Sequence, residues 1–164
     1  MNRNRSSKAR MYVRIKQDVP TVVASLLFLV VCGASAYGQS PLTCSNATIR
    51  GEYGFNFSGQ ILAGPTAGPI AGAGMIVFDG KGNLTEVDHV VSNGTPPPVE
   101  WRVATGTYTV NADCTGTAEI DFTDGSPPIH LSMVVVRRGL EILNVVDNPG
   151  TAISSVSIQR DSPL

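Results

Sequence analysis

The sequence predicts an all-β protein, built as a single antiparallel up-and-down β-barrel of about eight strands. After residue 40, apolar and polar residues alternate in short runs, and turn residues interrupt these runs about every ten positions. No stretch beyond the first forty residues shows the 3.6-residue apolar period of a long helix. Short connections favour antiparallel neighbours, and about eight strands are enough to close a barrel. A two-sheet β-sandwich is the alternative architecture.

The first 36 residues have the organisation of a helical signal peptide. A basic segment precedes Asp18, and the apolar segment 21–36 ends in Ala34-Ser35-Ala36, where small side chains form a cleavage site. We therefore expect residues 37–164 to be the mature barrel domain. An uncleaved membrane anchor is the alternative, because the apolar run is close to the length of a membrane span. Cleavage implies that the protein is secreted or lies in the periplasm or cell envelope, with no stable membrane span.

Removal of this leader would change the net charge from −1 to −6, since the leader holds six of the twelve basic residues and one of the thirteen acidic residues. An acidic surface without clusters of Lys and Arg repels phosphate groups. The charge therefore argues against nucleic acid and against anionic membrane surfaces as partners.

Two cysteines, Cys44 and Cys114, are left once the leader with Cys32 is removed. An even number of cysteines in an oxidising compartment indicates a disulfide bond. The sequence therefore predicts a bridge from the N-terminal segment to a hairpin, with two free thiols as the alternative. No CxxC motif or histidine cluster accompanies either cysteine, so we expect no metal site and no cofactor.

The strands are bounded by turn residues. Gly, Asn and Asp mark a tight hairpin turn in "FDGKGN" at 78–83, and three consecutive prolines mark a loop in "SNGTPPP" at 92–98. In the first strand Ile49, Tyr53 and Phe55 share one face, which we assign to the core. The expected strands are 48–57, 70–78, 83–91, 101–110, 116–122, 129–138, 140–146 and 151–159.

Three motifs together resemble a group of small exported bacterial proteins that are uncharacterised. The motifs are G-x-Y-x-F at Gly51–Phe55, F-D-G-x-G-N at Phe78–Asn83 and G-x-Y-x-V-x-x-D-C-x-G at Gly106–Gly116, and they span most of the mature chain. This resemblance implies no activity. The Gly51-x-Tyr53 pair also resembles the first strand of lipocalin and avidin-type barrels, which usually have Trp where Tyr53 stands. No binding residue is carried over from those barrels.

A ligand site inside the barrel is the kind of site that the sequence favours. Consecutive small residues at 71–74, Ala-Gly-Ala-Gly, leave room in a barrel that is otherwise just wide enough for side chains to fill. The aromatic side chains, Trp101 among them, are interpreted first as core and otherwise as the walls of such a site. The candidate ligand-binding residues are Tyr53, Phe55, Trp101, His89 and His130.

The sequence contains no catalytic motif. A Ser132–His89–acid triad is available by chance in a chain rich in Ser and Thr. Asp88 cannot be the acid that orients His89, because neighbouring side chains on a strand point to opposite faces. Two pairs of carboxylates share strand faces at a spacing that glycosidases use, and we interpret both pairs as solvated. They are Glu86 with Asp88, and Glu119 with Asp121.

Three functions are compatible with these patterns. The favoured one is non-catalytic binding of a small apolar molecule inside the barrel of a secreted protein. The second is a structural or adhesive module of the cell envelope that acts through its outer face. The third is a barrel-type cyclase or isomerase, which requires His89 or His130 to face a cavity beside an acid. An enzyme is less favoured because no catalytic motif is present.

Overall fold

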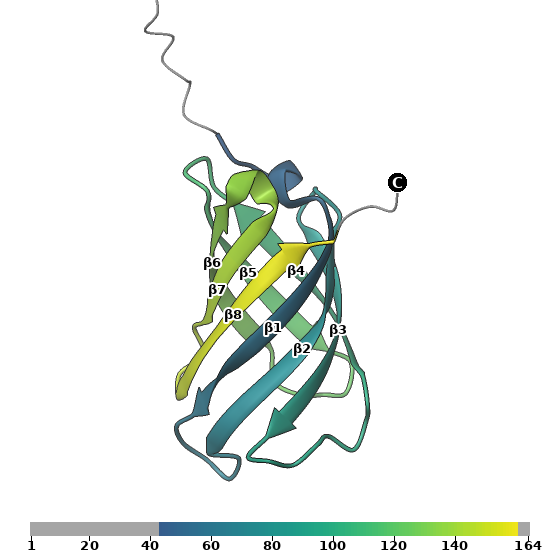
Figure 1. Cartoon of the computed structure of the whole chain (residues 1–164), viewed down its shortest axis with the longest axis vertical. Helices are drawn as coiled ribbons and strands as arrows, with labels where there is room; N and C mark the ends of the chain where they lie inside the picture. Colours follow the sequence, from purple (N-terminus) through teal and green to yellow (C-terminus); the bar gives the residue numbers. More distant parts are fainter. Residues whose placement is uncertain (1–42, 161–164) are drawn as a thin grey trace, which may run out of the picture. The chain divides into compact units, whose positions relative to one another are not determined.

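The computed structural model describes residues 43–160, which form one closed barrel of eight antiparallel strands (Figure 1). Each strand pairs with its neighbours in the sequence, and the first strand closes the barrel by pairing with the last. The strands are β1 (Gly51–Ile61), β2 (Gly68–Phe78), β3 (Asn83–Ser92), β4 (Arg102–Val110), β5 (Thr115–Phe122), β6 (Ile129–Val136), β7 (Glu141–Val146) and β8 (Thr151–Gln159). The predicted up-and-down barrel is confirmed. The predicted signal peptide lies outside the described residues.

Side chains alternate between the inside and the outside of the barrel wall. In β5, Ala118 and Ile120 are buried, whereas Glu119 and Asp121 are exposed. The interpretation of Glu119 and Asp121 as a solvated pair is therefore confirmed. Because every strand contributes one inward row, the interior is filled from eight directions.

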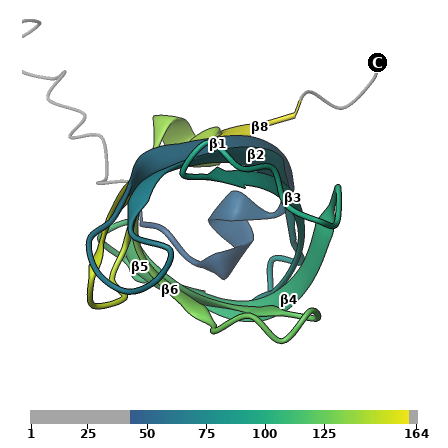
Figure 2. The ribbon, with the colours of Figure 1, turned by 90° about the horizontal axis from the view of Figure 1, so that it is seen from below.

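A short 3-10 helix, η1 (Asn46–Ile49), covers one end of the barrel (Figure 2). Ile49 is fully buried there. The side chain of Asn46 accepts a hydrogen bond from the backbone N–H of Val110 at 2.7 Å, which fixes the helix to β4. The prediction of Ile49 on the first strand is wrong, because β1 begins only at Gly51, whose φ of +138° is a conformation that glycine adopts without strain.

An aromatic cluster makes this end of the barrel solid. The ring of Phe78 lies edge-on to Tyr53, with centroids 5.4 Å apart, and edge-on to Tyr108, with centroids 4.8 Å apart. The hydroxyl of Tyr53 donates a 2.5 Å hydrogen bond to the backbone carbonyl of Gly139, in the turn η2 (Arg137–Gly139) between β6 and β7. Burial raises the pKa of Tyr53 to about 12, with a smaller contribution from Tyr108. The expectation that Tyr53 and Phe78 belong to the core is confirmed.

The predicted disulfide bond between Cys44 and Cys114 is present. It joins the segment before η1 to the β4–β5 hairpin, and the backbone N–H of Cys44 also donates to the carbonyl of Ala112 at 3.1 Å. The bond therefore holds the helix that covers the barrel end. No helix within the described part of the chain is long and apolar enough to cross a membrane.

Candidate ligand site inside the barrel

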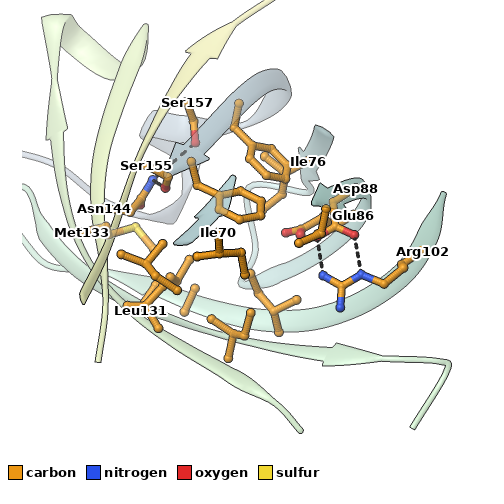
Figure 3. Close-up of a pocket in the computed structure, with 18 of the residues that line it drawn as sticks. Ile70, Ile76, Glu86, Asp88, Arg102, Leu131, Met133, Asn144, Ser155 and Ser157 are labelled. Carbon is orange, nitrogen blue, oxygen red and sulfur yellow. Dashed lines mark hydrogen bonds and ion pairs between the residues drawn. The ribbon is translucent and has the colours of Figure 1, made fainter. Parts of the chain in front are cut away.

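A cavity of about 150 Å³ lies inside the barrel (Figure 3). It extends toward the end opposite η1, because its lining includes Ile70, Val90 and Ile129 at that end of β2, β3 and β6. All eight strands contribute to its wall, which is mainly apolar. The aliphatic and aromatic lining residues are Phe55, Phe57, Ile70, Ile76, Phe78, Val90, Ala118, Ile120, Ile129, Leu131, Met133, Val146 and Ile153. An apolar cavity of about this volume can hold one benzene-sized molecule.

Two inward-facing glycines of β2 shape one wall of the cavity. Gly74 lies opposite Phe55 and Gly72 lies opposite Phe57 in the β1–β2 pairing. A Cβ atom at Gly72 would lie 2.5 Å from the ring of Phe57, and one at Gly74 would lie 2.6 Å from the ring of Phe55. The space predicted over these small residues is therefore occupied by the two rings, which are stacked with centroids 6.4 Å apart. The glycines allow the rings to lie flat against the wall.

A buried ion pair lies on the β3–β4 side of the cavity. Asp88 is 2% exposed, and Arg102 stands opposite it in the strand pairing. The guanidinium donates from Nε to Oδ1 at 2.9 Å and from Nη2 to Oδ2 at 2.6 Å (Figure 3). It also lies over the ring of Phe122, 4.1 Å from the centroid. Both carboxylate oxygens of Asp88 are thus satisfied by one cation.

Glu86 lies beside this pair and also lines the cavity (Figure 3). It is 7% exposed, and no hydrogen bond to its carboxyl group is present within residues 43–160. Burial and, to a smaller extent, the negative charge of Asp88 raise the pKa of Glu86 to about 8, and the positive charge of Arg102 limits this shift. At neutral pH the carboxyl group therefore mainly holds its proton.

The interpretation of Glu86 and Asp88 as a solvated strand face is wrong. In β3 their inward row also contains Leu84 and Val90, while Val87 lies on the outer face. Because β3 carries apolar residues on both faces, its sequence pattern does not determine which face points into the barrel. The inward orientation is stabilised by a cation from the next strand and by protonation of Glu86, and neither is visible in the β3 sequence.

A smaller polar group lies on the opposite wall, on β7 and β8. Asn144 is buried, and its side-chain amide donates to the hydroxyl groups of Ser155 at 3.0 Å and Ser157 at 3.3 Å. All three residues line the cavity (Figure 3). They were not predicted as site residues, although Asn144 alternates in step with the buried Ile142, which places it on the inner face.

The five candidate ligand-binding residues do not meet at one site. Phe55 lines the cavity, whereas Tyr53 is buried at the closed end. Trp101 is 52% exposed and packs edge-on against His89, with centroids 5.8 Å apart, so its assignment to the core is wrong. The Nδ1 atom of His89 is 2.5 Å from the carbonyl oxygen of Glu100.

Neither histidine lines the internal cavity. His130 is exposed on β6 and lines an open pocket on the outer surface together with Glu119 and Asp147. The Ser132–His89–acid triad does not form. Ser132 lies on β6 and His89 on β3, and these strands are not neighbours. The hydroxyl of Ser132 donates instead to Asp147. In the part of the chain that the structure describes, no three His, Cys, Asp or Glu side chains are grouped to hold a metal ion.

The fold and the cavity define a class of protein, a small closed antiparallel β-barrel with a mainly apolar internal cavity. Among solved structures the chain is similar to a redesigned β-barrel, with a TM-score of 0.51 and 11% sequence identity over 74% of this chain and 100% of the designed one. This likeness shows the fold alone. No protein-family model and no curated protein matches the chain.

Proposed function

We propose that this protein is exported and binds a small, mainly apolar molecule inside its barrel without changing it chemically. The observation that carries the proposal is the cavity of about 150 Å³, which combines an apolar wall with a few polar groups. The stacked rings of Phe55 and Phe57 offer a flat apolar surface, and Glu86 offers a polar contact. This combination is typical of sites that exclude water and orient one small ligand.

Export is supported by two features of the sequence and the fold. The N-terminal segment has the pattern of a signal peptide, and the Cys44–Cys114 bond is of the kind that persists in oxidising compartments. The negative charge of residues 37–164 disfavours nucleic acid as a partner.

Titration of the protein with toluene, followed by NMR of the side-chain methyl groups, tests the binding proposal. We expect shifts confined to methyl groups of the cavity wall, such as those of Ile129 and Leu131. The variant Ala118→Met places a longer side chain in the cavity and should abolish these shifts. Thr117→Met, which adds the same side chain on the outer face of β5, is the matched control. Shifts that survive in Ala118→Met would locate binding elsewhere and contradict the proposal.

A cyclase or isomerase that works by proton transfer is a second candidate. It is favoured by Glu86, because a carboxyl group with a pKa of about 8 in an apolar cavity can both donate and accept a proton near neutral pH. This candidate no longer depends on a histidine. Under it, Glu86→Gln would abolish turnover of a bound compound while leaving its binding intact, whereas a pure binding protein would leave every bound compound unchanged.

A further inference from the structure

We propose that the ligand of this barrel is a small apolar amine whose ammonium group pairs with the carboxylate of Glu86. The proposal rests on the proposed function, since it names the chemistry of the molecule that the cavity would hold. It starts from the charges that line the cavity.

Three charged or titratable side chains line the cavity in the described part of the chain, namely Glu86, Asp88 and Arg102. Arg102 uses Nε and Nη2 on both oxygens of Asp88. Glu86 therefore has no cation of its own, and it has no hydrogen-bond partner within residues 43–160. Among the described residues no fully buried side-chain nitrogen or oxygen atom lacks a partner, so the oxygens of Glu86 reach the open space of the cavity. A ligand in that space can supply the hydrogen-bond partner that the surrounding protein does not.

The surroundings of Glu86 decide which kind of ligand is favoured. Asp88 lies on the same inner face of β3 as Glu86. Across the strand pairings, Glu86 lies opposite Ile76 of β2 and Ala104 of β4. The charged groups near it are thus Asp88 and Arg102, and the phenol groups of Tyr53 and Tyr108 stay neutral because burial raises their pKa. A ligand carboxylate would lie near two acidic side chains, Asp88 and Glu86. An ammonium group would instead neutralise the charge of Glu86, since Asp88 is already paired with Arg102.

The rest of the cavity fits the apolar part of such a ligand. Phe55 and Phe57 lie stacked on β1, and Ile70, Leu131 and Ile153 complete an apolar wall. The volume of about 150 Å³ matches a single aromatic or branched aliphatic group. The net charge of −6 for residues 37–164 would also attract a cation to the protein from solution.

Binding of an amine has a consequence for protons. With a pKa of about 8, Glu86 mainly holds its proton at pH 7 in the free protein, whereas the free amine is an ammonium ion. When the ion pair forms, the proton of Glu86 passes to the buffer, and the ammonium group keeps its own protons. One proton is therefore released for each amine bound, and affinity should rise as the pH rises from 6 to 8.

Isothermal titration calorimetry with four probes of similar shape tests this proposal. The probes are benzylamine, benzyl alcohol, toluene and benzoate, each titrated into the full chain in two buffers of different ionisation enthalpy. We expect benzylamine to bind at least about tenfold more tightly than benzyl alcohol, a difference of about 1.4 kcal/mol. We also expect release of close to one proton for benzylamine and none for toluene. Benzoate should not bind.

Two variants separate a direct role of Glu86 from a general effect. Glu86→Gln keeps the shape of the side chain but removes its charge, and it should abolish both the preference for benzylamine and the proton release. Glu119→Gln, the same change on the outer face of β5, should leave both unchanged.

The outcomes distinguish the two proposals. If toluene or benzyl alcohol binds as tightly as benzylamine, the amine proposal is wrong and the cavity function stands. If none of the four probes binds, both proposals are wrong. The four probes are compared on the unaltered protein, so their ranking decides the question even if Glu86→Gln does not fold.

Discussion

Arg102 and Asp88 form a bidentate ion pair across β3 and β4, inside a wall that is otherwise lined mainly by apolar side chains. Asp88 is almost completely buried, and the guanidinium is covered on one face by Phe122. A buried pair of this kind contributes little net stability, but the loss of one partner leaves a charge without compensation. The pair also engages Arg102, which is the one basic residue in the described part of the chain that lines the cavity and could otherwise neutralise Glu86.

The first prediction concerns this pair. Arg102→Met should lower the free energy of unfolding by about 3–5 kcal/mol at pH 7, because it leaves Asp88 buried without a cation. The double variant Asp88→Asn/Arg102→Met should lose less than Arg102→Met alone. Urea unfolding followed by tryptophan fluorescence measures both values.

An exposed pair provides the control for this prediction. Arg160 and Glu52 form an ion pair at 3.2 Å on the outer surface. Arg160→Met should change the free energy of unfolding by no more than about 0.5 kcal/mol, since solvent screens such pairs. Equal losses for Arg102→Met and Arg160→Met would show that burial of the inner pair has no energetic consequence.

The second prediction concerns the pH dependence of stability. The pKa of Glu86 rises from 4.5 to about 8 on folding, so between these values the folded protein binds a proton that the unfolded chain has released. The contribution of Glu86 to the free energy of unfolding is therefore fully present below pH 4.5. It falls as the pH rises to 8, by up to about 1.4 kcal/mol per pH unit. Glu86→Gln should remove this decline and be more stable than the unaltered protein at pH 8.

Chemical unfolding at a series of pH values between 4 and 9 measures the effect. Glu119→Gln should follow the unaltered protein throughout, because Glu119 is exposed. Parallel curves for the unaltered protein and Glu86→Gln would mean that the carboxyl group is not held in its protonated form by the fold.

The barrel could be predicted from the sequence because its determinants are local. The turn at 78–83 shows this clearly, since Asp79 accepts hydrogen bonds from the backbone N–H groups of Lys81, Gly82 and Asn83 at 2.6, 2.9 and 3.0 Å. The side-chain amide of Asn83 donates to the other carboxylate oxygen at 2.7 Å, and this bond together with the backbone bonds lowers the pKa of Asp79 to about 2. All of these bonds stabilise the β2–β3 hairpin turn. Turns of this kind determine which strands are neighbours. Eight strands that each pair with the next one in the sequence form a closed barrel when the first also pairs with the last.

The cavity could not be predicted in the same way, because its polar groups depend on contacts between strands. Glu86 and Asp88 share a strand with apolar residues on both faces, and their orientation depends on Arg102, which is 14 positions away from Asp88. Trp101 was assigned to the core from its side chain alone, whereas it lies just before β4 and packs on His89 outside the wall. Phe55 was predicted correctly to face inward, because strict alternation with polar residues fixes its side.

The third prediction concerns the disulfide bond. The variant Cys44→Ser/Cys114→Ser should lower the free energy of unfolding by about 4 kcal/mol, because the unfolded chain is released from a long closed loop. Reduction of the unaltered protein should cause a similar loss and add the mass of two hydrogen atoms. The variant should show neither response to reductant. An unchanged mass on reduction would show that the bond does not form in the isolated protein.

The fourth prediction concerns Gly74, which links the stability of the wall to the shape of the cavity. A methyl group at this position would meet the carbonyl oxygen of Val87 and would lie 2.6 Å from the ring of Phe55. Gly74→Ala should therefore lower the free energy of unfolding by about 1–3 kcal/mol. Gly54→Ala is the control on β1, because its nearest neighbour would be the Sδ atom of Met75 at 3.8 Å.

Gly74→Ala should also alter the proposed ligand site. The ring of Phe55 cannot stay flat over β2 when Gly74 carries a methyl group, so it must move toward the cavity that it lines. Gly74→Ala should therefore weaken the binding of toluene, while Gly54→Ala leaves it unchanged. A variant that is destabilised but binds toluene with unaltered affinity would show that the Phe55 ring does not form part of the binding surface.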